Sequence, residues 1–178
     1  RPLDHTLPTL AEELLEQGYD TAGFVSNTSL CGRQTGLARG FLHYDDLYSS
    51  FRAVYRGSLL SLLPTNYTPD LRRSAAEINA LFFDWLDRPR HRPFFAFLNY
   101  FDAHDPYRVP DAAFDRFASM PARERLRIRQ RWLIDELDRN NPAEVLLAVD
   151  TDDAAIAYLD HHVGRLLDEL ERRGILDD

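Results

Sequence analysis

The chain has 178 residues, 44% hydrophobic and 28% charged, a composition ordinary for one globular domain with a real core. Its net charge is −8, which argues against general binding to nucleic acid or to anionic membranes. Every basic residue is Arg, so no Lys is present to act as a base or to form a Schiff base, and the single Cys31 excludes an internal disulfide.

The sequence shows neither a membrane-spanning segment nor a signal peptide. No apolar run approaches the roughly 18 residues that cross a bilayer, and no signal peptide opens the chain. Because residue 1 is Arg rather than Met, we expect the chain to be processed or cut from something longer. The compartment and the oligomeric state therefore stay open.

The first part of the chain predicts a helix, a tight turn and a buried strand. Residues 6–17 have helical spacing, with a capping box formed by Thr9 and Glu12 and a left-handed Gly18 at the end. Residues 21–26 are short and apolar enough for a buried strand. Residues 27–48 look irregular. An aliphatic cluster over 59–63 is expected to form a short helix packed on the core.

Thr68-Pro69-Asp70 predicts the start of a helix that continues to about Leu86, with an apolar stripe made of Leu71, Ala75, Ile78, Phe82 and Trp85. The apolar run after Pro93 predicts a strand buried on both faces. A short helix is expected from 111 to about 119, and an exposed helix over 122–139 with a narrow apolar stripe made of Leu126, Trp132, Leu133 and Leu137. The longest helix is predicted over 150–173, with one apolar face made of Ile156, Leu159, Val163, Leu166, Leu167 and Leu170.

The predicted elements indicate an α/β fold, helix-rich and with only two strands. Two parallel strands do not make an independent sheet, so we expect further strands outside this chain. In open α/β sheets the ligand lies beyond the carboxyl ends of the strands. The residues that follow the two predicted strands are therefore the first candidates for a site.

Asp102, His104 and Asp105 follow the second strand. Carboxylates beside an imidazole can bind a metal, and a protonated His can bind an anion. The alternative is an ordinary turn, since Asp before Pro is a routine turn signal. Asn27 follows the first strand, where it either contacts a ligand or simply begins a loop.

Three further groups carry weaker signals. His161 and His162 are adjacent on a helix, so at most one points at any site, and a solvated helix face is the simpler interpretation. Residues 150–153 are rich in Asp but lack the Gly and the downstream Glu of a calcium loop, which favours a helix N-terminus. Cys31 has no base that the sequence pairs with it.

Four segments, in order along the chain, resemble the sulfatase branch of the alkaline-phosphatase-like superfamily. The first joins Thr9-Leu10-Ala11-Glu12-Glu13-Leu14 to Gly18-Tyr19-Asp20-Thr21-Ala22, and the second is Gly36-Leu37-Ala38-Arg39-Gly40-Phe41. The third runs from Arg92-Pro93-Phe94-Phe95 to His104-Asp105-Pro106-Tyr107. The fourth combines Ala157-Tyr158-Leu159-Asp160 with Val163-Gly164-Arg165-Leu166-Leu167-Asp168-Glu169-Leu170 and Gly174.

The resemblance implies part of an α/β/α sandwich, with residues 1–178 as a single partial domain from the middle of a catalytic domain. It also implies attack by a metal-bound nucleophile, a formylglycine made within Cys/Ser-x-Pro-x-Arg, on a sulfate or phosphate ester. Cys31 is followed by Gly, Arg, Gln and Thr and does not fit that motif. We therefore expect no catalytic nucleophile in this segment, and a divalent metal such as calcium whose ligands lie outside it.

Of the family's functional residues, His104 matches the His-x-Pro histidine that contacts the anionic oxygens of the ester. The family's Gly-Lys-Trp-His loop would fall near residues 25–28, where Ser26 and Thr28 replace its Lys and His. Asn27 is expected to supply a donor instead. The resemblance thus implies substrate binding by His104 and Asn27, with no metal ligand among the residues of this chain.

The function expected is a segment of a metal-dependent, sulfatase-like hydrolase, inactive alone, whose substrate is a small-molecule or glycan sulfate or phosphate ester. The replaced loop leaves room for a phosphodiesterase, a phosphonate hydrolase or a phospho-group transferase of the same superfamily. Two other classes remain open. One is a binding or regulatory module that keeps the fold without chemistry, and the other is a small metal hydrolase that uses Asp102, His104 and Asp105.

Overall fold

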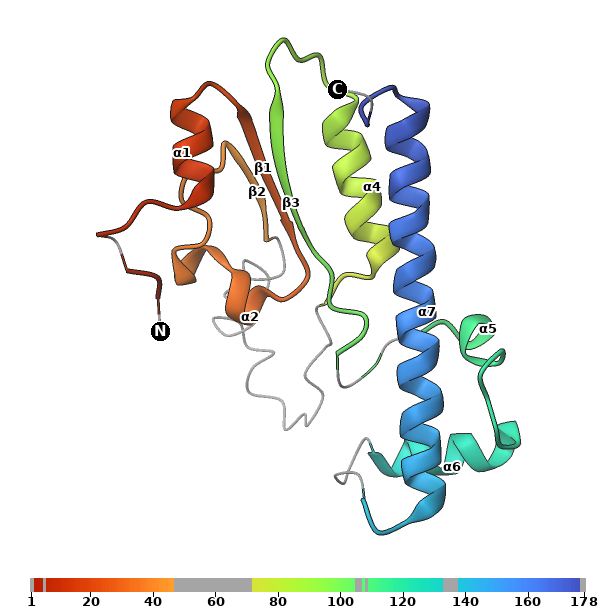
Figure 1. Cartoon of the computed structure of the whole chain (residues 1–178). Helices are drawn as coiled ribbons and strands as arrows, with labels where there is room; N and C mark the ends of the chain where they lie inside the picture. The colour runs from red at the N-terminus through yellow and green to blue at the C-terminus, as the bar shows by residue number, and fades with distance from the viewer. Residues whose placement is uncertain are drawn as a thin grey trace, which may run out of the picture. The chain divides into compact units, whose positions relative to one another are not determined.

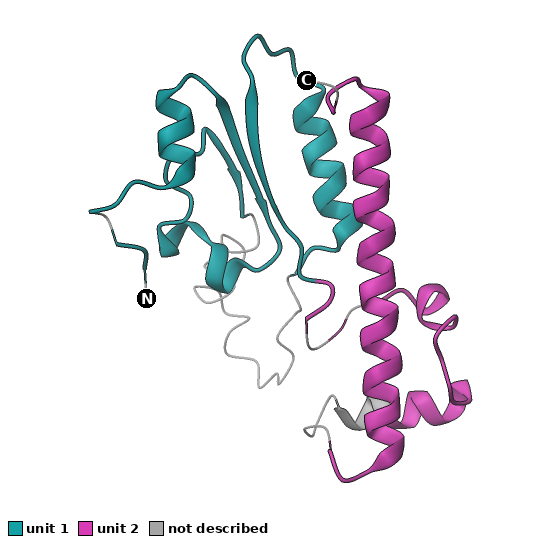
Figure 2. Ribbon diagram, viewed as in Figure 1, with its two compact units in different colours: residues 1–101 teal, residues 102–178 magenta. Residues whose placement is uncertain are grey.

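The computed structural model describes residues 2–4, 6–46, 72–104, 107, 109–132 and 138–176. The chain forms two compact units, residues 1–101 and 102–178, which Figure 2 shows in different colours. Unit 1 holds the sheet, and the described residues of unit 2 form three helices joined by turns and irregular segments. The predicted helix over 59–63, the Thr68-Pro69-Asp70 start and Asp105 lie outside the described residues.

Unit 1 contains three parallel strands in the order β2-β1-β3. β1 (Asp20–Val25) is central and pairs with β2 (His43–Asp45) on one side and β3 (Phe94–Asn99) on the other. α1 (Leu10–Glu16) and α4 (Ala75–Leu86) cover opposite faces of this sheet (Figure 1). The α/β class and the parallel strands are as predicted, and the layers fit part of an α/β/α sandwich.

The sheet corrects two expectations. A third strand, β2, lies in the stretch predicted to be irregular, beside α2 (Thr28–Cys31) and a 3₁₀ turn, η1 (Arg33–Thr35). β3 is half-buried along its length, not buried on both faces, because it pairs on one side within the described residues. The fully covered strand is β1, where Ala22, Phe24 and Val25 have no exposed surface.

Aromatic side chains fill both faces of the sheet in unit 1. On the α4 face, Phe24 packs edge-on against Phe82 and Trp85, at 5.8 and 6.2 Å between ring centroids. On the other face Phe41 stacks on Phe95 at 5.8 Å. Each such ring buries a large apolar area, which stabilises the layers by about 2–3 kcal/mol per side chain.

The helix boundaries in unit 1 follow local capping chemistry. α1 begins at the predicted capping box, in which the Thr9 hydroxyl accepts from the Glu12 N–H and Glu12 accepts from the Thr9 N–H. α4 begins later than predicted, at Ala75, because Ser74 and Glu77 form a second capping box. Its buried residues Ile78, Phe82 and Trp85 are those of the predicted stripe.

The Gly36–Phe41 element locks the loop between η1 and β2 onto α1. The Arg39 guanidinium donates to the carbonyls of Asp4 and Leu7 at 3.2 and 3.1 Å. Gly40 has φ +79°, and a Cβ there would lie 2.1 Å from the Glu12 amide nitrogen. Only glycine permits this approach, so the element that resembles the family's Gly…Arg-Gly-Phe pattern has a structural role here.

Unit 2 is organised by α7 (Pro142–Arg172), with α5 (Asp111–Phe114) and α6 (Ala122–Trp132) as shorter helices (Figure 1). Its core is a small cluster made of Phe114, Met120, Ile128, Leu147 and Ala154. α7 begins two turns before the predicted start, because Asn141 caps it through Ala143 N–H and Pro142 fits its first turn.

Two predicted apolar faces in unit 2 differ from the structure. Among the α6 side chains that the structure describes, residues 122–128, Ile128 is buried, whereas Leu126 of the predicted stripe is 58% exposed. In α7 the residues Ile156 and Leu167 of the predicted face are 52% and 47% exposed. No helix among the described residues combines the length and the apolar character that a bilayer crossing requires.

Candidate functional site

The carboxyl ends of β1 and β3 in unit 1 bring two asparagines together. In the pairing register Val25 lies opposite Asn99, so Asn27 follows β1 two residues beyond that pair. The backbone N–H of Asn27 donates to Asn99 Oδ1 at 2.9 Å, and Asn27 Oδ1 accepts from the Leu30 N–H at 3.2 Å as the N-cap of α2. Both side chains are half-buried.

Arginine ion pairs hold the neighbouring carboxylates of this edge. Arg73, 6% exposed, donates to Oδ1 of Asp45, the last residue of β2, at 2.6 Å. Arg33 donates through Nε to Asp46 Oδ1 at 3.1 Å, and its backbone N–H donates to the other oxygen of Asp46. These contacts fix the loops around Asn27 and compensate the negative charge of both Asp residues.

Ser26 does not replace the family lysine as a ligand contact. Its side chain is 1% exposed, and its hydroxyl donates to the Arg73 carbonyl at 2.6 Å. Thr28 is also buried, at 7% exposure. Of the three residues in the place of the family's loop, Asn27 is the one with a side chain that solvent reaches.

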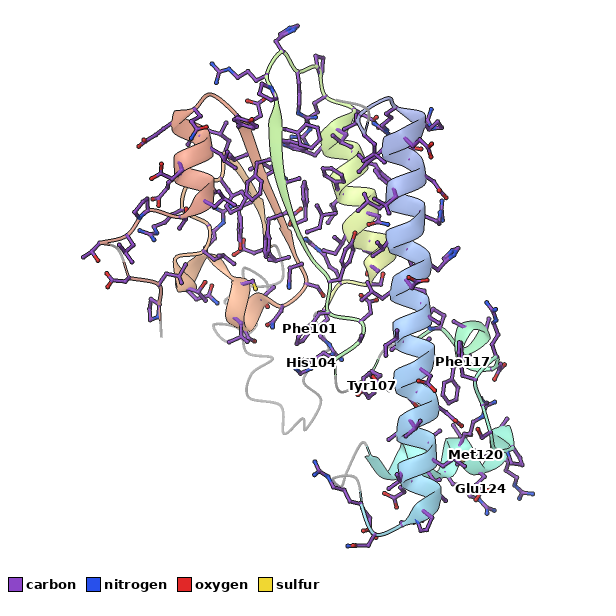
Figure 3. All side chains as sticks on the ribbon, in the orientation of Figure 1. Phe101, His104, Tyr107, Phe117, Met120 and Glu124 are labelled. Carbon is purple, nitrogen blue, oxygen red and sulfur yellow. The ribbon has the colours of Figure 1, made fainter. Side chains whose placement is uncertain are left out.

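His104 belongs to unit 2, in the turn that directly follows the end of unit 1, and Figure 3 labels it. Its imidazole is exposed, whereas Asp102 two residues before it is 4% exposed. The turn is the local structure expected for this sequence. An exposed imidazole can donate an N–H to an anion, which is compatible with the role expected of His104.

The remaining candidates have structural roles. His162 is not on a solvated face: it is 8% exposed, and its ring packs edge-on against Tyr158 at 4.4 Å. Burial, with the charges of His161 and Arg165, lowers the pKa of His162, which favours its neutral form. Burial raises the pKa of the Cys31 thiol, which makes it a poor nucleophile.

Asp150 lies inside α7 rather than at a helix N-terminus as expected. Its carboxylate is 5% exposed and accepts from the Ser119 N–H at 2.7 Å and from the Ser119 hydroxyl at 2.8 Å. Asp150 thus anchors the segment that leads into α6. It is a structural carboxylate and not part of a cation site.

The described residues do not fit a resident metal ion, because they bring no three His, Cys, Asp or Glu side chains together. Asp102 and His104 would each need ligands from elsewhere. The small metal hydrolase that uses Asp102, His104 and Asp105 therefore gains no support from the described part of the chain. No catalytic step through a metal is derived from these residues.

The chain is an α/β protein with a parallel sheet, and polar side chains lie at the carboxyl ends of its strands, where open α/β sheets generally bind their ligands. The comparison with family models is more specific, since the sulfatase family model matches residues 1–178. The chain belongs to the sulfatase family. At the level of the family it is a sulfatase-like hydrolase, and sulfatases act on sulfate esters and generally use a divalent metal. No curated protein and no solved structure matches the chain.

Two features were not identified from the sequence: Asn99 at the carboxyl edge of the sheet, and a Ser-x-Pro-x-Arg pattern at residues 119–123. Asn99 ends β3, but its bond to Asn27 crosses 72 positions and has no local signal. Ser119-Met120-Pro121-Ala122-Arg123 fits Ser-x-Pro-x-Arg by residue type, so the pattern is present in the chain. Ser119 is held by Asp150 before α6, which gives the match a structural explanation. The nucleophile's place outside this segment stays a prediction.

Proposed function

We propose that this chain is the central segment of the catalytic domain of a metal-dependent, sulfatase-like hydrolase that acts on sulfate or phosphate esters. The observation that carries the proposal is the family match over residues 1–178. Small-molecule and glycan esters are the substrate classes, and nucleic acid is not one of them, because the net charge of −8 repels a polyanion.

In this proposal His104 and Asn27 contact the anionic oxygens of the ester. The exposed imidazole of His104 donates an N–H to a non-bridging oxygen, on which negative charge increases in the transition state. Asn27 donates from its amide nitrogen. The divalent metal, calcium or a similar ion, and the nucleophile come from outside this segment, so residues 1–178 alone should be inactive.

A phosphodiesterase, phosphonate hydrolase or phospho-group transferase is the second candidate function. The observation that favours it is the edge loop at 26–28, where buried Ser26 and Thr28 stand in place of the family's Lys and His. Without that cationic Lys, the loop contacts the ester through a neutral amide. The two candidates differ in the ester that they hydrolyse.

The test compares residues 1–178 with the protein encoded by the complete gene. Each is assayed with 4-nitrophenyl sulfate, 4-nitrophenyl phosphate and bis(4-nitrophenyl) phosphate, with calcium, magnesium or manganese added. The complete protein should hydrolyse one ester class and the segment none. Activity of the segment alone would overturn the expectation of inactivity, and inactivity of the complete protein on all three esters would overturn the proposed function.

His104→Ala in the complete protein should lower kcat/KM about 100-fold, the usual effect of removing one donor to a developing oxyanion. His91→Ala is the matched control, since His91 is an exposed histidine in the turn before β3, at the opposite end of that strand. Equal activity of the two variants would contradict the assigned role of His104.

A further inference from the structure

At the carboxyl ends of β1 and β3, the side-chain oxygens of Asn27 and Asn99 each accept a hydrogen bond, whereas their side-chain nitrogens donate none among the described residues. Asn99 Oδ1 accepts from the Asn27 N–H, and Asn27 Oδ1 accepts from the Leu30 N–H. A backbone N–H bonds only to the oxygen of a carboxamide, so these contacts fix which end of each side chain is nitrogen. Neither Nδ2 donates a hydrogen bond in the described structure, and neither is a buried unpaired atom.

The side-chain amide of Asn99 lies close to the backbone nitrogen of Asn27. The Asn99 Nδ2 is bonded to the same carbon as Oδ1, which is 2.9 Å from the Asn27 nitrogen. It therefore lies within about 5 Å of that nitrogen, given ordinary amide bond lengths. Both side chains are half-buried and come from strand ends that pair through Val25 and Asn99, so the edge holds them without help from a ligand.

The carboxylates near the two asparagines do not oppose the binding of an anion, because each is paired with an arginine. Asp45 and Asp46, the acidic residues that end β2, are paired with Arg73 and Arg33. Their charges are compensated before any ligand arrives. The N-terminus of α2 offers nothing further, because Asn27 itself caps it.

We propose that Asn99, together with Asn27, forms a donor-only subsite for one oxygen of a tetrahedral ester anion. This inference rests on the proposed function and adds a residue and a specific chemistry to it. Asn99 binds through its Nδ2 hydrogens, and its Oδ1 positions the Asn27 loop. Sulfate and phosphate esters both carry the kind of non-bridging, negatively charged oxygen that such a subsite recognises.

Asn99→Asp tests the subsite without removing the contact that orders it. Aspartate keeps an oxygen that accepts the Asn27 N–H, but it replaces the two donor hydrogens with a negative acceptor. Asn27→Asp likewise keeps the cap on Leu30. Asn140→Asp is the matched control, an exposed asparagine before α7 with the same change in charge.

The measurement is a calorimetric titration of the complete protein with methyl sulfate and, separately, methyl phosphate at constant ionic strength. Asn99→Asp and Asn27→Asp should each weaken binding at least tenfold, and Asn140→Asp by less than twofold. In ¹⁵N spectra the side-chain NH₂ signals of Asn27 and Asn99 should move on binding, while that of Asn140 stays. The ester that binds more tightly identifies the source of the anion.

Unchanged affinity in both Asp variants overturns the subsite, as does binding of neither ester to the wild-type protein. If the complete protein hydrolyses an ester and the Asp variants match the control, only the subsite is wrong. If the complete protein hydrolyses none of the three 4-nitrophenyl esters, the proposed function is wrong, whatever the titration shows.

Discussion

The two units of the chain, coloured separately in Figure 2, hold their proposed site residues in different ways. In unit 1 Asn99 ends β3 and Asn27 follows β1, and the pairing of these strands and the Asn27 N–H to Asn99 Oδ1 hydrogen bond set their positions. In unit 2 His104 sits in an exposed turn, and the fold depends on a long helix with a small core and one buried carboxylate anchor.

The difference indicates that backbone contacts fix the positions of residues in unit 1, whereas a few side-chain contacts do so in unit 2. A strand end moves only when the sheet register changes, whereas a turn adjusts when its neighbours do. Substitutions that disturb backbone packing should therefore damage unit 1 most. Unit 2 should respond chiefly to losses at its anchor.

The largest effect is expected from Gly40→Ala. The new Cβ would lie 2.1 Å from the backbone nitrogen of Glu12, at a φ of +79°, so α1 must move away from the loop. We expect a loss of about 4 kcal/mol in the free energy of unfolding. Hydrogen exchange should increase in β1 and in α1 well before it changes in α7.

Gly174→Ala in unit 2 and Gly18→Ala in unit 1 are the controls. Both glycines have positive φ, +67° and +89°, but a Cβ would meet nothing within 4 Å. Each should cost about 1 kcal/mol, the penalty of the left-handed conformation alone. If Gly40→Ala costs no more than these two, backbone contact is not what positions unit 1.

An intermediate effect is expected from Asp150→Ala in unit 2. Alanine accepts neither of the hydrogen bonds that the Asp150 oxygens now take from the Ser119 N–H and hydroxyl. The loss of both buried hydrogen bonds should cost about 2–3 kcal/mol. Urea unfolding measures the loss, and Asp153→Ala, exposed on the same helix, should stay within about 0.5 kcal/mol of wild type.

The smallest effect is a pH dependence shared by both units. Burial is the main cause that lowers the pKa of His43 in unit 1 and of His162 in unit 2 below the ordinary 6.5. The unfolded chain therefore takes up these protons first, and stability falls as the pH drops below about 6.5. We expect each contribution to be smaller than the loss at Asp150.

His43→Gln and His162→Gln should each flatten the stability curve between pH 7 and 5, measured by urea unfolding at steps of half a pH unit. The exposed His91→Gln is the control and should leave the slope as it is, since His91 is not among the charges that shift the pKa of His43 or His162. A slope that survives in the double variant would assign the pH dependence to other groups.

The elements that could be predicted from the sequence are those with a local signal, such as a capping box, an apolar run or an apolar stripe. The Thr9–Glu12 capping box, the apolar strand after Asp20 and the stripe of α4 all appear as expected. β2 was missed because three residues, His43-Tyr44-Asp45, make no apolar run. The early start of α7 has a local signal in Asn141-Pro142, an N-cap followed by Pro at the first helical position.

The candidate site was predictable only in part. Asn27 and His104 are candidates because each follows an apolar strand run, and their roles stay predictions. The family match agrees with the recognised resemblance. Asn99 could not be found, since its partner is set by the pairing of β1 with β3. The orientation of His162 depends on which face of α7 is covered, and the helical period alone does not decide that.

The central position of β1 also has a consequence for the order in which the chain folds. Its partner β3 lies 74 residues further along, from Asp20 to Phe94. During synthesis β1 leaves the ribosome long before the strand that completes its pairing, and such distant pairing is slow. The apolar run from Thr21 to Val25 must avoid aggregation during that interval. The rate of translation and the supply of chaperones should therefore affect the yield of folded protein.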